Sequence, residues 1–415
     1  MERKGRLLSI FDSLVYWLIV LLPFSVAIAP GFANTVIGLM IFGFVVKKVI
    51  LRQRLIYLNQ VNIAFLFVFL AAILSFRNTV SIATSFTGIL KLINAFFIFV
   101  VCAEEIKDKL HIRRIIFSII FAASLLSFDA IWQLLLGKDF IHGNPPRRES
   151  STLLLRATGP FPGPNALGIY LSCIVPLIVG LTLFYFRNKR RIIMLFVSLL
   201  VIVGLYLTYS RGALIGFFIA FLFLAIMKRN KVIIGALIAS IIIFPFLAPK
   251  NMKDWLAVAK IYPLVFLLNG DRISVYKNTS YMISQHPFIG VGVNTFSRVY
   301  AKYKLPEVEK IFATPDTFYA HNNFLQMAGE TGLLGLAAFL WFLFVLFKKN
   351  FSAFKGIKDE YLKIVSLSLI GCLIAFLING LTETSLYNAR VAMIFWFLTG
   401  FSLAVSRMHE TDPNI

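Results

Sequence analysis

Charged residues are scarce in this chain: Asp, Glu, Lys and Arg together make up 14% of its 415 residues, whereas 59% are hydrophobic. Soluble domains average about 25% charged residues, so this composition excludes a soluble protein of this size. Apolar runs of roughly 17–25 residues fill most of the chain, and each is long enough to cross a bilayer as a helix. The sequence therefore predicts an all-α polytopic membrane protein.

Acidic residues and cysteines are also few, at 19 and 3 respectively. The chain has no Asp-x-Asp pair to hold a divalent cation, and its cysteines lack the spacing of a metal site. We therefore expect neither a metal nor a cofactor. Cys102, Cys173 and Cys372 lie in or at the ends of apolar runs, which predicts small buried side chains.

The net charge of +22 does not indicate nucleic-acid binding. Lys and Arg occur in short clusters between apolar runs, as the positive-inside bias of membrane proteins predicts. A nucleic-acid interface would need a coherent soluble basic face, and no segment here provides one.

The apolar runs predict about twelve spans. Spans one to nine occupy residues 1–247, with a smaller outward loop at 137–165. A large helical loop follows at 248–320, and the last three spans lie within 321–415. The first span resembles a signal peptide at its start, but its apolar run is too long and we expect it to be uncleaved. The predicted spans are 11–29, 32–46, 61–76, 82–101, 112–136, 166–186, 192–208, 212–227, 232–247, 322–347, 362–381 and 389–405.

Orientation follows from the basic clusters. Cytoplasmic termini put the clusters at 47–54, 107–114, 187–191, 228–231 and 348–363 inside, and leave Arg77, Arg211 and Arg390 in short outward loops. This arrangement predicts a multi-pass membrane protein whose termini are both cytoplasmic and whose two long loops lie on the outer side. In the larger loop we expect an interfacial amphipathic helix at 251–268, a second helix at 271–285 and a short helix at 294–304 capped by Asn294.

Three of the arginines at the predicted outer surface are candidate site residues. Arg211 opens the eighth span and can be a snorkelling end-cap or face a cavity. Arg156, close to Asn165 before the sixth span, can be an ordinary loop charge. Arg272 lies in the first turn of a helix, where a cation opposes the helix dipole. Either a local pair with Asp271 or a bound anion would hold it there.

His321 precedes a helical pattern longer than the hydrocarbon core, so its first turns, with Asn322, should stand in water or the headgroup layer. A histidine there can cap the helix or act as a base. Glu330 falls near the opposite face by the 3.6-residue repeat, which favours packing or support of the site over a pair with His321.

Together these residues predict a site for a diphosphate at one membrane face. Arginine binds phosphate bidentately and stays charged, so two or more arginines can neutralise a diphosphate leaving group without a metal. Histidine can accept the proton of a hydroxyl.

The sequence resembles the O-antigen ligase and polymerase superfamily of bacterial envelope glycosyltransferases. The resemblance rests on the short motifs Tyr209-Ser210-Arg211-Gly212-Ala213, Arg272 with His286-Pro287…Gly290-Val291-Gly292…Phe296, and His321-Asn322…Leu325…Glu330…Gly332…Gly335. The twelve-span layout with a large outer loop before the tenth span agrees with it.

The resemblance implies a metal-independent GT-C-type transferase, most like the O-antigen ligase. Such a protein would lie in the bacterial inner (cytoplasmic) membrane and would move a glycan from undecaprenyl diphosphate to lipid A–core or another glycan acceptor. Its long outward loops and its active site would then be periplasmic. It implies that Arg211 and Arg272 bind the diphosphate, and that His321 is the base or a further diphosphate contact. The substrate-binding residues that we expect around them are Arg156, Asn165, Tyr276, Asn322 and Glu330; Tyr276 stands where many relatives have tryptophan.

Three other functions remain open. A polymerase of the same superfamily would join repeat units that are both lipid-linked, and a protein oligosaccharyltransferase would need a peptide acceptor. A lipid-linked sugar transporter would need ionisable residues near mid-membrane, often in matching halves. Lys91 is the one such candidate in the sequence, and no internal repeat accompanies it.

Overall fold

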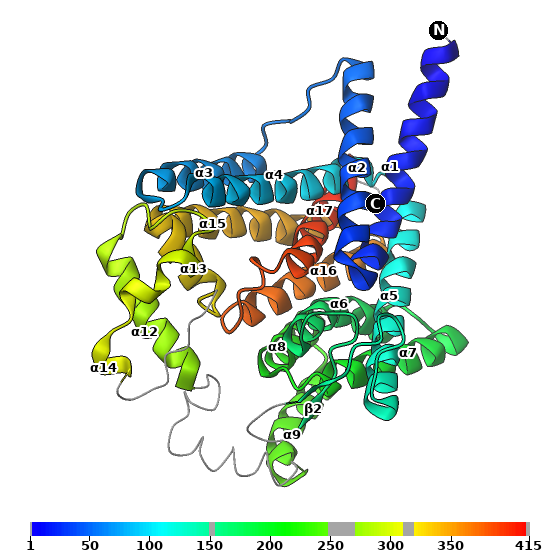
Figure 1. Ribbon diagram of the computed structural model, residues 1–415. Helices are drawn as coiled ribbons and strands as arrows, with labels where there is room; N and C mark the ends of the chain where they lie inside the picture. The colour runs from blue at the N-terminus through cyan, green and yellow to red at the C-terminus, as the bar shows by residue number, and fades with distance from the viewer. Residues whose placement is uncertain (1, 149–153, 248–269, 310–318, 412–415) are drawn as a thin grey trace.

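The computed structural model describes residues 2–148, 154–247, 270–309 and 319–411, which are almost entirely α-helical (Figure 1). One short hairpin pairs Arg147 with Arg156 and Arg148 with Leu155. The elements are α1 (Glu2–Ile28), α2 (Pro30–Leu51), α3 (Gln60–Leu74), the 3-10 turn η1 (Ser75–Asn78), α4 (Ile82–Glu105), α5 (Lys109–Leu136), β1 (Arg147–Arg148), β2 (Leu155–Arg156), α6 (Pro164–Phe184), α7 (Asn188–Leu207), α8 (Arg211–Met227), α9 (Lys231–Leu247), α12 (Gly270–Gln285), α13 (Phe296–Val299), the 3-10 turn η2 (Tyr300–Tyr303), α14 (Pro306–Glu309), α15 (Asn323–Gly356), α16 (Glu360–Asn379) and α17 (Ala389–Thr411).

Within the described residues, ten helices are long and apolar enough to cross a membrane. This confirms an all-α polytopic membrane protein. The helices α8 and α9 have 17 residues each, so at 1.5 Å per residue they fall a little short of a hydrocarbon core of about 30 Å. The predicted count of twelve spans therefore remains a prediction for these two helices.

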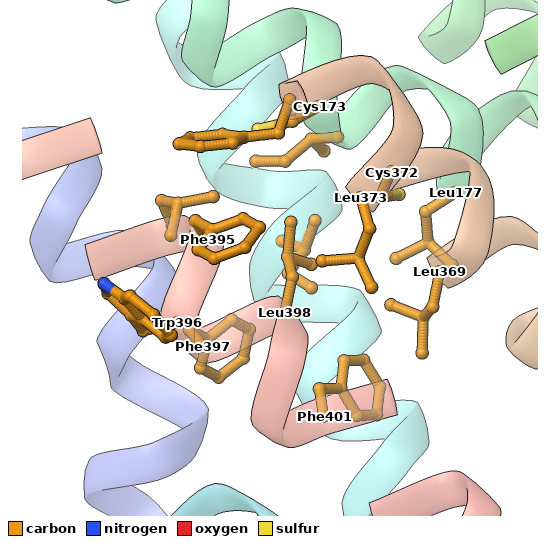
Figure 2. Close-up of a cluster of buried hydrophobic side chains, with 14 of the residues drawn as sticks. Cys173, Leu177, Leu369, Cys372, Leu373, Phe395, Trp396, Phe397, Leu398 and Phe401 are labelled. Atoms are coloured by element: carbon orange, nitrogen blue, oxygen red, sulfur yellow. The ribbon is translucent and has the colours of Figure 1, made fainter. Parts of the chain in front are cut away.

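The centre of the bundle is formed by α6, α16 and α17, most of whose residues are buried. α16 packs against α6 and α8, α17 against α4, and α15 against α3. Figure 2 shows Cys173 of α6 and Cys372 of α16 among leucine and phenylalanine side chains of this core. All three cysteines are free and buried, which confirms the prediction from the sequence.

Large apolar side chains cover much of the outside of the bundle. On α7, Ile192, Ile193, Phe196 and Leu199 are all exposed, and Phe117 of α5 is too. A soluble protein rarely exposes so much contiguous apolar surface, whereas a bilayer covers it. The same helices that fill the interior with one face therefore present the other face to lipid.

Several helix ends that the basic clusters assign to the cytoplasmic side lie next to one another in the structure. Lys47 pairs with Glu105 and Lys48 with Glu104, which joins the end of α2 to the end of α4. Arg407 of α17 donates to the backbone oxygens of Glu104 and Ile106. These basic helix ends are neutralised by the few acidic residues nearby.

At another end of the bundle, α15 is broken where the 286–294 loop docks on it. Gly332 has φ 70° and ψ −176° inside α15, so the carbonyls around it are free to accept from outside the helix. The amide of Gly292 donates to the Glu330 oxygen at 2.9 Å, and the Leu333 amide donates to the Pro287 oxygen at 2.7 Å. The helices α12, α13 and α14 gather at this end, away from the labelled chain ends (Figure 1).

This docking explains the glycines of two sequence motifs. A Cβ on Gly290 would lie 2.4 Å from the backbone of Glu330, and one on Gly332 would lie 2.1 Å from the Phe288 oxygen. Both residues also have a left-handed φ, which glycine adopts without steric cost. The motifs are therefore complementary halves of one contact.

The larger loop corrects one prediction. The helix α12 forms as expected, but the next helix begins at Phe296, and its N-cap is Thr295. Asn294 does not cap it: the Asn294 amide group donates to the Thr84 oxygen and accepts from Lys91. The predicted interfacial helix at 251–268 lies outside the described residues.

Candidate functional site

The carboxylate of Glu383, in the loop between α16 and α17, is the point where three predicted site residues meet. Its Oε1 accepts hydrogen bonds from the Arg272 guanidinium and from Asn165 Nδ2. Its Oε2 lies 3.4 Å from Nδ1 of His321. The start of α12, the start of α6 and the residue pair before α15 are thus joined by a single acidic side chain.

Arg272 lies in the first turn of α12, which packs against α15. A cation at that position opposes the helix dipole, and the carboxylate of Glu383 offsets the cost. The sequence left open a pair with Asp271 or a bound anion. The structure gives Arg272 a distant acidic partner, Glu383, and leaves the Arg272 side chain 17% exposed. The side chain of Asp271 lies outside the described residues.

His321 is held in place by the polar residues around it. Its φ of 51° is left-handed, a conformation that costs about 1–2 kcal/mol for a residue with a side chain. Asn322 caps α15 through the amides of Phe324 and Leu325 and donates to the Leu381 oxygen at 3.0 Å. The Tyr276 hydroxyl lies 2.9 Å from the backbone oxygens of both His321 and Leu381, and its single hydrogen can be donated to either. The histidine is therefore fastened to the same loop that carries Glu383.

Arg156 and Asn165 reach the site from the smaller loop. Arg156 Nε donates to the Thr208 oxygen at 3.0 Å, and Arg156 Nη2 donates to Asn165 Oδ1 at 2.7 Å. Asn165 Nδ2 in turn donates a hydrogen bond to Glu383 Oε1. Behind them, Gln133 accepts from the amides of Thr158 and Gly159, which fixes the turn after Arg156.

Arg211 is the first residue of α8, as predicted, and its side chain is half-buried. The next residue, Gly212, packs so tightly on the loop after α16 that a Cβ there would lie 2.2 Å from Thr382 Oγ1. Because Thr382 adjoins Glu383, the backbone at Arg211 lies beside the loop where Arg272 and His321 meet.

Glu330 belongs to the contact between α15 and the docked 286–294 loop, and not to the Glu383 cluster. It is 1% exposed and accepts from the amides of Asn294 at 2.7 Å and Phe296 at 3.3 Å, and from Gln326 Nε2 at 2.9 Å. Gln326 in turn accepts from the amide of Ala320, directly before His321. Glu330 therefore holds the docked loop in position. Through Gln326 it also fixes the backbone directly before His321.

Electrostatics favour an ionised centre. Burial acts to raise the pKa of Glu383, but its hydrogen bond with His321 and the charge of Arg272 together lower that pKa below its ordinary value. Burial raises the pKa of Tyr276 to about 12, although Arg272 acts in the opposite direction. The Tyr276 hydroxyl therefore remains a donor near neutral pH. Arg272 thus pairs directly with this carboxylate, and Arg156 is connected to it through Asn165.

Sequence reasoning did not single out Glu383. It searched the outer face for basic residues and histidine, because these suit a diphosphate. A signal was present nonetheless: Glu383 is one of only 19 acidic residues and lies in a short loop between two apolar runs, where a carboxylate needs a partner.

The fold and this cluster define a class: a multi-pass helical membrane protein with an arginine-rich polar site at one end of its bundle. Residues 196–340 match the family model described as O-antigen ligase, which confirms the predicted relation to that superfamily of membrane glycosyltransferases. The matched part contains Arg211, Arg272, His321 and Glu330, whereas Arg156, Asn165 and Glu383 lie outside it. None of the curated proteins compared with the chain matches it.

Proposed function

We propose that the protein is an O-antigen ligase, which moves a glycan from undecaprenyl diphosphate to lipid A–core on the periplasmic face of the bacterial inner membrane. The observation that carries this proposal is the convergence of Arg272, His321 and Asn165 on Glu383. This arrangement offers fixed positive charge for a diphosphate and an oriented imidazole for a hydroxyl.

In the proposed reaction, the acceptor hydroxyl oxygen forms a bond to the anomeric carbon while the bond from that carbon to the diphosphate oxygen breaks. The electron pair of the broken bond stays on the diphosphate. Arg272 and Arg211 bind the diphosphate and neutralise its developing charge, with no metal ion required. The proton of the acceptor hydroxyl passes to His321.

The position of Glu383 supports a base role for His321. Because Nδ1 of His321 faces Glu383 Oε2, a hydrogen there would leave Nε2 free to accept a proton. The carboxylate would then stabilise the imidazolium that forms, as an acidic partner does for other catalytic histidines. The His321 side chain is 37% exposed, so an acceptor can reach it.

The test uses purified protein with lipid-linked O-antigen and lipid A–core, in detergent and with a chelator present. Native protein should transfer the glycan, and the variants Arg211→Ala, Arg272→Ala and His321→Ala should each lose transfer while remaining folded. Lys302→Ala, an exposed change on the nearby turn η2, is the control and should keep full activity. Transfer retained by the Arg272 and His321 variants would refute the mechanism.

The acceptor decides between related reactions. A product in which repeat units lengthen on the lipid carrier, with lipid A–core left unmodified, would assign the polymerase reaction to the same site. Because detergent removes separate compartments, a protein that only transports lipid-linked sugar would give no transfer product at all.

A further inference from the structure

Lys91 places a positive charge midway along the predicted span α4, where its side chain is exposed, and the proposed reaction makes no use of it. It lies nine residues beyond Ile82 on α4, or about 14 Å along the helix axis, near the middle of a hydrocarbon core of about 30 Å. Its Nζ donates to Asn294 Oδ1 at 3.0 Å. A charge at this depth is costly unless it faces a partner or a cavity.

Lys91 lines such a cavity, which is open on one side and has a volume of about 310 Å³. Its walls come from α2, α3, α4, α15 and α17, from Val293 and Asn294 of the docked loop, and from the loop before α17. Lys91 is the only charged residue of the described lining, and Asn94 and Asn294 line the cavity with it. The remaining wall is largely apolar and includes Ile98, Phe339 and Trp396. The volume is within the lower range of ligand sites, which begins at about 300 Å³.

The cavity is separate from the Glu383 cluster, because Arg272, His321 and Glu383 are absent from its lining. The two are connected through one loop, since Leu386 and Tyr387 line the cavity three and four residues after Glu383. Leu386 is fixed there by its amide, which donates to Asn323 Oδ1 at 3.0 Å.

We propose that this cavity binds the phosphate of a membrane lipid against Lys91, with the lipid's apolar chain along Ile98, Phe339 and Trp396. An ammonium group has three donors, and one of them bonds Asn294. A phosphate oxygen is a strong charge-assisted acceptor for another. The apolar wall gains from covering a hydrocarbon chain, so the cavity matches an anionic amphiphile better than a free anion or a neutral lipid.

A purely structural role for Lys91 makes a different prediction. The amide of Asn294 donates to Glu330 Oε2 at 2.7 Å, so Lys91, Asn294 and Glu330 form a chain that ties α4 to the docked loop. If that tie were the whole role of Lys91, replacing it would lower stability and leave lipid binding unchanged. The lipid proposal does not depend on glycan transfer and is tested without it.

The experiment measures lipid binding to the purified full-length protein in detergent by native mass spectrometry. The probes are phosphatidylglycerol, undecaprenyl phosphate and, as a neutral reference, diacylglycerol. Lys91→Gln removes the charge, and Ala95→Leu keeps it while adding bulk to the cavity wall. Arg77→Gln is the matched control, because it removes an exposed positive charge from the turn η1, outside the cavity.

We expect Lys91→Gln to weaken binding of a phosphate-bearing lipid about tenfold, the loss typical of one charge-assisted hydrogen bond. Ala95→Leu should weaken it too, and Arg77→Gln should not. Loss confined to phosphatidylglycerol identifies a phospholipid, and loss confined to undecaprenyl phosphate identifies an isoprenoid carrier.

Binding of both lipids by Lys91→Gln within twofold of the native protein would overturn the proposal, as would absence of binding to the native protein. A loss of thermal stability in Lys91→Gln with lipid binding intact would assign the structural role instead. Should Lys91→Gln fail to fold, Ala95→Leu decides: unchanged binding of both lipids would then refute the site.

Discussion

Replacing Glu383 by glutamine tests whether the carboxylate organises the site. Glutamine keeps the size and one acceptor oxygen but removes the charge that joins Arg272 to His321. Hydrogen bonds to charged groups contribute about 1.5–3 kcal/mol each. The Arg272 and Glu383 side chains are 17% and 13% exposed, so partial screening by water favours the lower end, about 2 kcal/mol for the site.

If the transition state loses this stabilisation of about 2 kcal/mol, the rate of glycan transfer should drop about 30-fold. The assay is initial-rate transfer from a fluorescent lipid-linked glycan, with thermal unfolding measured on the same samples. Glu307→Gln makes the same chemical change at an exposed position on α14 and should retain the native rate. Glu383→Asp should also be impaired, because the shorter side chain cannot reach Arg272, Asn165 and His321 together.

The reasoning is refuted if Glu383→Gln transfers glycan within twofold of both the native protein and Glu307→Gln. A lower rate that tracks a matching loss of folded protein would instead make Glu383 a structural residue alone. The two outcomes are distinguished by expressing the rate per folded molecule.

Three further predictions concern Arg272, the charge of Glu383 and the docking contact at Gly332. Arg272→Lys should lower transfer about tenfold or more, measured as an initial rate, because an ammonium lacks the planar fork that binds a diphosphate bidentately. The stability difference between native protein and Glu383→Gln should be full near neutral pH and shrink in acid. A carboxylate with a lowered pKa stabilises the fold above its ordinary pKa of about 4.5, and this contribution is lost as pH falls through the lower folded value; unfolding of both proteins between pH 7 and pH 3 measures it, and a constant difference would contradict it. Gly332→Ala should prevent stable folding, since its Cβ would meet the Phe288 oxygen at 2.1 Å, whereas Gly38→Ala on α2, with nothing within 4 Å, should leave thermal stability almost unchanged.

Glu330 illustrates where local patterns stopped being informative. The helical repeat placed Glu330 away from His321, although His321 itself lies outside α15, which begins at Asn323. It did not show that α15 breaks at Gly332 or that the 286–294 loop occupies the break. Both depend on a contact between segments some 40 residues apart, and the paired glycines of that contact are only two small residues in the sequence.

Asn294 shows the same limit. An asparagine before a short helical pattern is a favoured N-cap, yet the local preference lost to tertiary partners. Thr84, Lys91 and Glu330 each bond Asn294, and the helix starts two residues later instead.

The sequence by itself determined that the chain is a helical membrane protein, because hydrophobic runs of spanning length leave few other structures in a bilayer. It also predicted Arg272 and His321 as site residues, since polar groups between spans are few and their chemistry is distinctive. Only the tertiary structure decided that Glu383 joins them, that Asn165 completes the cluster and that Lys91 lines a cavity. Those facts depend on which helix ends pack together, and packing is set by side-chain shape across segments far apart in the chain, which no local pattern records.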